Sequence, residues 1–209
     1  MKWLKRILIS LLVLIILIVG ISFFLPKGYH VERSATSTAA PSTIYGILNN
    51  LKTYDSWMPW NQIDPNMQKT FGPTSVGEGA YYTWSSKMDQ VGKGKLTIAH
   101  SEPSNVTANL DFGEMGSSTA GWNIVPESGN SKITWYIDGN CEQGSFVWQV
   151  MGKWMNALGL FDKMMGKDFE KGLTSLKKVA EAPDGKTVAA QGLPVVTPAP
   201  VADSIAPVK

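Results

Sequence analysis

The stretch 152–181, GKWMNALGLFDKMMGKDFEKGLTSLKKVAE, decides the fold. Its apolar positions recur at spacings of three and four, and its charged residues lie mainly off that stripe. This pattern is typical of a helix that packs along one face. The sequence therefore predicts one long helix over 152–181. The stripe comprises Leu158, Phe161, Met165, Phe169, Gly172, Leu173, Leu176 and Val179.

Short segments with alternating apolar and polar residues precede this helix, and turn-forming residues separate them. Alternation over four to eight residues predicts strands, and short connections favour antiparallel neighbours. The strands are predicted at 28–37, 79–85, 95–100, 105–112, 118–125 and 132–138, with a further strand possible at 145–150. Two short helices are predicted after the first strand, one opened by Pro41 and one over 51–57, followed by a turn at 57–60.

The order of elements predicts an α+β fold in which a curved antiparallel sheet wraps around the long C-terminal helix. One amphipathic helix needs one sheet face against which to bury its apolar stripe. A cavity can remain where the sheet and the helix diverge. The fold is thus expected to be a helix grip, with two short helices after the first strand.

An uncharged, strongly apolar run occupies residues 7–25 near the N-terminus. Its 19 positions span about 28 Å as a helix, close to the hydrocarbon thickness of a bilayer. Lys2, Lys5 and Arg6 precede it, which predicts a single-pass anchor with a cytoplasmic N-terminus and an extracytoplasmic domain. A cleaved secretory signal is the alternative, although 22–26 offers no A-x-A-like site. The predicted division is an anchor at 1–26, a ligand-binding domain at 27–182 and a Pro/Ala/Val-rich disordered tail at 183–209.

Charge and composition argue against several classes of function. Removing Lys2, Lys5 and Arg6 from the 19 basic residues leaves 16 against 17 acidic ones, so the domain lacks the basic excess of nucleic-acid-binding proteins. A single cysteine and two separated histidines do not make a zinc site, and no nucleotide-binding or hydrolase motif occurs. We therefore expect no cofactor, no metal and no nucleic-acid partner, and the sequence indicates no particular protein partner.

Several segments, taken in order, resemble the START/polyketide-cyclase (SRPBCC) superfamily of helix-grip proteins. They are 31–34 (VERS), 40–45 (APSTIY), 57–60 (WMPW), 92–98 (GKGKLTI) with the following 102–103 (EP), 132–135 (KITW) and 165–173 (MGKDFEKGL). The resemblance covers about 29–181. It implies a hydrophobic cavity for lipids, sterols, polyketides or other apolar ligands. Some members of the superfamily are enzymes, but they share no universal catalytic residue, so no catalytic role is carried over.

Aromatic and long apolar side chains on the expected inner faces are the candidates for lining such a cavity. They are Trp57, Trp60, Tyr82, Trp84, Leu96, Ile98, Leu110, Trp122, Trp135, Phe161 and Met165. Each is equally explained as ordinary core packing. His100 with Glu102, and Asp111 with Glu114, are conceivable acid–base pairs whose alternative is a solvated surface.

Three functions remain open. The first is a membrane-anchored carrier or sensor for a lipid or another apolar small molecule. The second is a cyclase- or hydrolase-type enzyme, which needs a polar group such as His100, Asp111 or Tyr82 inside the cavity. The third is an interaction module with a filled core. Fold alone does not choose among them.

Overall fold

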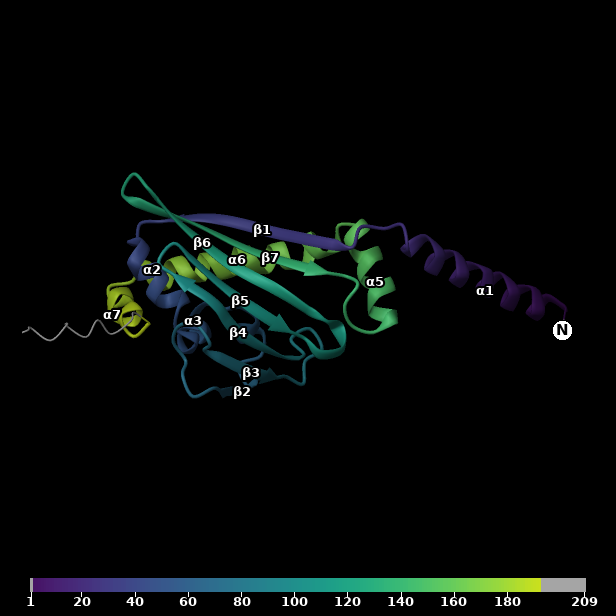
Figure 1. Cartoon of the computed structure of the whole chain (residues 1–209), viewed down its shortest axis with the longest axis horizontal. Helices are drawn as coiled ribbons and strands as arrows, with labels where there is room; N and C mark the ends of the chain where they lie inside the picture. The colour runs from purple at the N-terminus through teal and green to yellow at the C-terminus, as the bar shows by residue number, and fades with distance from the viewer. Residues whose placement is uncertain (1, 193–209) are drawn as a thin grey trace, which may run out of the picture.

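The computed structural model describes residues 2–192, which form an elongated molecule with a helix projecting from one end (Figure 1). Seven antiparallel strands make one sheet in the order β1-β7-β6-β5-β4-β3-β2. The strands are β1 (Gly28–Ser37), β2 (Gln68–Phe71), β3 (Tyr81–Ser85), β4 (Lys93–Glu102), β5 (Asn105–Asp111), β6 (Ser117–Glu127) and β7 (Asn130–Asn140). The predicted α+β helix-grip fold is confirmed. The short edge strand β2 was not predicted.

Short helices follow β1, as the sequence predicts. They are α2 (Pro41–Leu48), the 3-10 turn η1 (Leu51–Thr53), α3 (Tyr54–Trp57) and α4 (Pro59–Ile63). Pro41 and Pro59 each occupy the first turn of a helix, where a missing N–H costs nothing. Trp60 therefore lies in α4, whereas only a turn was predicted there.

Two helices replace the single helix predicted over 152–181: α5 (Phe146–Ala157) and α6 (Leu160–Glu181). Gly159 separates them with φ +65°, a left-handed conformation that glycine adopts without a steric penalty. The possible strand at 145–150 is wrong, because Ser145 begins α5. The Ser145 hydroxyl accepts a hydrogen bond from the Trp148 amide at 3.5 Å.

Helix α6 lies along the concave face of the sheet and buries Phe169, Leu173 and Leu176. Two glycines permit this close approach, since a Cβ at Gly172 would meet Trp135 and one at Gly166 would meet Arg33. Arg33 of β1 binds α6 through Asp162 at 2.8 Å and Glu170 at 2.9 Å. The core thus sits between sheet and α6.

A further helix, α7 (Gly185–Ala190), lies in the range predicted as a disordered tail. It packs against α2, where a Cβ at Gly46 would meet the Ala189 carbonyl oxygen. The Asn49 side chain donates to the Gly192 carbonyl at 2.6 Å. Small residues in both segments allow this contact, which periodicity alone does not indicate. The remainder of the predicted tail, 193–209, lies outside the described residues.

Helix α1 (Lys2–Ser22) extends away from the domain beyond the start of β1 (Figure 1). Within residues 2–192 it is the one helix with the length and hydropathy to cross a membrane, properties that an N-terminal signal sequence shares. None of its apolar window is buried against the domain.

Strand register arranges the inward-facing residues in rows across the sheet. One row, toward the side from which α1 emerges, joins Tyr29, Gly139, Ser118, Leu110, Leu96 and Tyr82. The next row joins Val31, Ile137, Ala120, Ala108 and Ile98. A third row joins Arg33, Trp135, Trp122 and Val106. We call the side of the Tyr29 row the α1 end of the domain and the side of α7 the distal end.

Candidate functional site

The interior between the sheet and α6 is an aromatic cluster assembled from four elements. Trp57 of α3 lies 5.6 Å from Trp135 of β7 and 6.0 Å from Trp122 of β6, measured between ring centroids. Phe169 of α6 stacks on Trp135 at 4.2 Å. The helix-grip interior is therefore lined by large, flat, apolar surfaces.

Small residues in the sheet make room for these rings. Ala108 and Ala120 are paired neighbours in the middle row and are buried. A leucine or isoleucine at either position would occupy space on the concave face. The alanine pair instead presents only small side chains on this part of the concave face.

Three buried indole N–H groups have no hydrogen-bond partner among residues 2–192. They belong to Trp57, Trp122 and Trp135, the three tryptophans at the centre of the cluster. A buried donor without an acceptor costs about 1–3 kcal/mol, so most native donors find a partner. Three such donors in one cluster mark the place where an acceptor from a ligand or from water would be stabilised.

The predicted site residues fall into two groups by exposure. The buried group comprises Trp57, Tyr82, Leu96, Ile98, Trp122 and Trp135. The partly buried group, which packs against the same core, comprises Trp60, Trp84, Leu110, Phe161 and Met165. All eleven therefore contribute to one interior, and five of them also reach its margin.

Most of the partly buried group lies toward the α1 end. Leu110 belongs to the Tyr29 row, and Trp84 lies one row closer to α1, opposite Gly94. Phe161 contacts Tyr29 with ring centroids 4.3 Å apart, and Met165 follows one turn later on α6. The margin of the apolar interior is thus on the side from which α1 emerges.

The sequence offered three polar groups for a catalytic role: His100, Asp111 and Tyr82. Of these three, Tyr82 faces the interior. Its side chain is buried, and burial raises the pKa of its phenol above the ordinary value, so it is neutral at physiological pH. His100 is exposed and lies 3.5 Å from Glu102 and 3.8 Å from Glu78. Asp111 is also exposed and accepts a hydrogen bond from the Gly113 amide at 2.8 Å.

Tyr54 and Phe169 are two of the contributors to the interior that were not nominated from the sequence. Tyr54 is buried, and its ring lies 4.8 Å from Trp57 and 6.0 Å from Trp122. Phe169 was part of the helical stripe but not of the site. Tyr54 lies three residues before Trp57 and Phe169 four residues after Met165, so helical spacing from a nominated residue could have found both.

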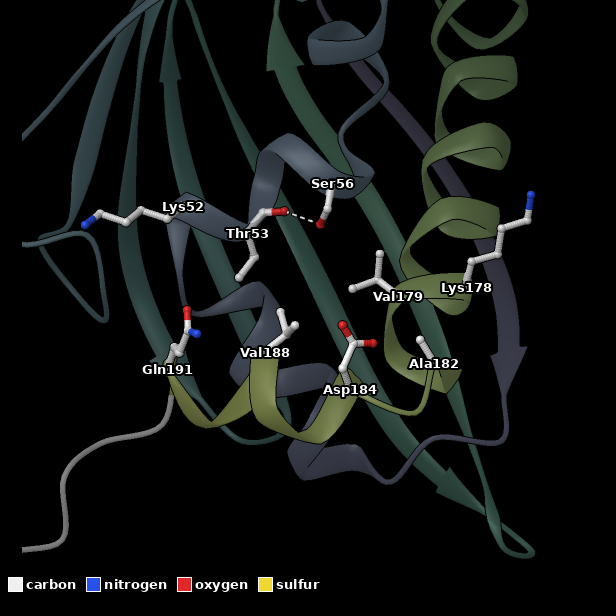
Figure 2. Close-up of a pocket in the computed structure, with 9 residues that line it drawn as sticks. All are labelled: Lys52, Thr53, Ser56, Lys178, Val179, Ala182, Asp184, Val188 and Gln191. Carbon is white, nitrogen blue, oxygen red and sulfur yellow. Dashed lines mark hydrogen bonds between the residues drawn. The ribbon is translucent and has the colours of Figure 1, made fainter.

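A separate cleft of about 440 Å³ opens at the distal end, between α3, α7 and the end of α6. Figure 2 shows Val179 and Val188 directed into it, together with the carboxylate of Asp184. The Lys52 and Lys178 ammonium groups point outward, away from each other. The cleft therefore lacks converging cations for an anionic ligand, and it does not connect with the nominated residues.

The arrangement defines a class: single-domain helix-grip proteins with an apolar interior between a curved sheet and a long helix. This chain belongs to the polyketide cyclase/dehydrase and lipid transport family, whose model matches residues 29–181. No curated protein matches its sequence. Family membership supports ligand binding or cyclase-type chemistry without choosing between them.

Solved structures with the same fold have very different sequences. The di-domain aromatase/cyclase StfQ of the steffimycin biosynthetic pathway has a TM-score of 0.56 at 10% identity, over 74% of this chain and 51% of that one. A protein of unknown function from Staphylococcus aureus has a TM-score of 0.52 at 11% identity, over 74% of this chain and 95% of that one. A protein from Chromobacterium violaceum has a TM-score of 0.50 at 11% identity, over 76% of this chain and 99% of that one. These likenesses concern the fold alone.

Proposed function

We propose that this protein is a membrane-anchored binding protein for a lipid or another apolar small molecule held between the sheet and α6. The observation that carries the proposal is the group of three unpartnered indole N–H donors inside an aromatic interior. An apolar molecule with a carboxyl, ester, keto or hydroxyl oxygen would supply the missing acceptor while its hydrocarbon contacts the rings. In a core without a ligand, each of these three donors would stay unpaired at a cost in stability.

The ligand would enter the interior between the sheet and α6 from the α1 end of the domain. The fully buried rings already contact one another, so a ligand needs the partly buried side chains to change rotamer. Phe161 and Met165 on α6, with Leu110 opposite, are among these partly buried side chains. Methionine is well suited to such adjustment because its unbranched side chain is flexible.

Anchoring rests on α1. In the proposed topology Lys2, Lys5 and Arg6 stay in the cytoplasm, the helix crosses the bilayer, and the domain is extracytoplasmic. A tether of this kind keeps the apolar interior close to a source of lipid. If α1 is instead a cleaved signal, the same binding domain is released on the same side of the membrane.

A cyclase-type reaction is the second candidate, favoured by Tyr82. Its neutral phenol lies inside the apolar interior, where it can donate a hydrogen bond to a substrate carbonyl or transfer a proton. Under this alternative Tyr82→Phe abolishes turnover and leaves ligand retention intact. Under simple binding, the same substitution changes retention at most modestly.

The decisive experiment is native mass spectrometry of the full chain extracted in detergent. We expect wild type to carry a bound apolar molecule, and Met165→Trp to lose it because the larger ring fills the margin of the interior. Met164→Trp is the matched control, since the neighbouring methionine is 60% exposed and points away from the core. Circular dichroism would verify that both variants are folded.

The interaction-module alternative predicts a different result. If wild type carries no molecule of any lipid class and gains none on incubation with fatty acids, sterols or phospholipids, ligand binding is refuted. Equal retention by Met165→Trp and Met164→Trp would place the ligand outside the α6–sheet interior.

A further inference from the structure

Helix α5 has its amphipathic faces reversed relative to a helix of a water-soluble domain. Its buried residues are Gly152 and Lys153, whereas Val147 is 70% exposed and Leu158, at its C-terminal cap, is 59% exposed. Other exposed large apolar side chains on this helix are Phe146, Trp148 and Met151. An apolar surface this continuous is unusual on a monomeric soluble protein and marks a contact with a membrane or a partner.

The polar side of α5 is fastened to the domain and to the segment that follows α1. Lys153, only 5% exposed, lies 3.3 Å from Glu142, which also binds Lys27 at 3.0 Å. Asn156 donates to the Gly28 carbonyl at 2.8 Å and to the Pro26 carbonyl at 3.3 Å. These contacts hold the apolar face of α5 turned outward.

The outward face of α5 continues onto α1. The two helices enclose an apolar groove of about 620 Å³, lined by Ile15, Ile18, Val19, Phe146, Val147, Val150, Met151, Trp154 and Leu158. The Trp154 indole donates to the Ile18 carbonyl at 3.2 Å. Ile18 lies four residues before the end of α1, so α5 meets α1 about 6 Å inside the helix end. Figure 1 shows α5 oriented crosswise to α1, beside the point where α1 joins the domain.

We propose that α5 is an interfacial helix that lies in the outer leaflet, with lipid acyl chains filling its groove with α1. The proposal rests on the proposed anchoring by α1. A bilayer is the occupant that fits, because the groove is continuous with the surface of α1 that must face lipid. An amphipathic helix lying flat in the interface buries its apolar face about 5–10 Å deep, which matches the depth at which α5 meets α1.

The consequence is a fixed orientation of the domain on the membrane. A single-pass helix joined by a short connector leaves a domain free to tilt, whereas a second, crosswise contact restricts that tilt. The α1 end then faces the leaflet, which places Phe161 and the margin of the interior beside the lipid. Ligand could therefore pass between bilayer and interior without crossing water.

Depth-dependent quenching tests this arrangement in the full chain. The one native thiol is removed by Cys141→Ala, and single cysteines labelled with the fluorophore NBD are introduced by Val147→Cys, Val125→Cys or Leu12→Cys. The purified protein is reconstituted in phosphatidylcholine vesicles with or without lipids brominated on the acyl chain. Val125, 50% exposed on β6 near the distal end, is the matched control for Val147.

We expect brominated lipid to quench the label at positions 147 and 12 and to leave the label at position 125 unchanged. Quenching at position 12 without quenching at 147 overturns the interfacial helix and leaves the anchor intact. No quenching at position 12 refutes the anchor itself. A label at 147 that is shielded from water but not quenched by lipid means that a second copy of the chain covers α5, which also overturns the proposal.

Discussion

Helices α5 and α6 follow each other in the chain, yet they turn opposite faces toward the domain. Helix α6 buries Phe169 and Leu173 against the sheet and exposes four of its five lysines. Helix α5 buries Lys153 and exposes Phe146 and Val147. The hydrophobic effect drives apolar surface out of water, so the outer surroundings of the two helices must differ. The outer side of α6 suits water, and that of α5 suits lipid.

The two leucines at matched places in this comparison should respond very differently to truncation. Leu173→Ala removes a side chain that is 2% exposed, and we expect the free energy of unfolding to fall by about 2–5 kcal/mol. Leu158→Ala, at a 59% exposed position, should change it by less than about 0.5 kcal/mol. Urea unfolding of the full chain in detergent micelles, followed by circular dichroism, measures both.

A large loss for Leu158→Ala would show that α5 turns its apolar face into the protein, and the contrast between the helices would disappear. A negligible loss of unfolding free energy for Leu173→Ala would instead contradict the packing of α6 against the core.

Sequence periodicity identified the apolar stripe of α6, but it did not delimit α5, and it could not indicate what surrounds either helix. A spacing of three and four tells which residues share a face, and it is silent about whether that face meets a sheet or a membrane. Residues 145–150 were interpreted as a possible strand because a short, mostly apolar stretch fits either a strand or a helix. The strands β1 and β4 to β7 were predicted well because alternation is specific to half-buried strands.

The interior was predictable to a similar degree. The inward faces of the strands followed from alternation and the inward face of α6 from helical spacing, and all eleven nominated residues lie in or against one core. The pairing of Ala108 with Ala120 depends on strand register, and the contact of α7 with Gly46 depends on long-range packing. Neither leaves a local signal. The unpartnered indole groups likewise follow from three-dimensional placement rather than from residue type.

The fit of α6 against the sheet gives a second, smaller test. A Cβ at Gly172 would collide with the indole of Trp135. We therefore expect Gly172→Ala to lower the free energy of unfolding by about 1–3 kcal/mol, despite the better helix propensity of alanine. Thr174→Ala, on the exposed side of the same helix, should have an effect within about 0.5 kcal/mol. Unfolding in detergent measures both, and stabilisation by Gly172→Ala would mean that α6 stands farther from β7.

The smallest expected effect concerns the attachment of α5 to the domain, whose strength should depend on pH. Hydrogen bonding to Lys27 and then to Lys153 lowers the pKa of Glu142 below its ordinary value of 4.5. A lowered folded-state pKa stabilises the attached state above pH 4.5 and loses that contribution as pH falls through the folded value. We therefore expect the hydrogen-exchange protection factors of α5 to fall below about pH 4.5, by less than about tenfold because Glu142 is solvent-exposed.

Two substitutions separate the ionic contact made by Glu142 from the uncharged hydrogen bonds made by the Asn156 side chain. Glu142→Gln should lower the protection of α5 at neutral pH and remove its acid dependence, since no carboxylate is left to titrate. Asn156→Ala should lower protection equally at all pH values, because its amide bonds to the Pro26 and Gly28 carbonyls do not titrate. Protection of α6 should follow neither change. If α5 and α6 lose protection together, the two helices open as one unit, and α5 is not an independently attached element that lipid holds in place.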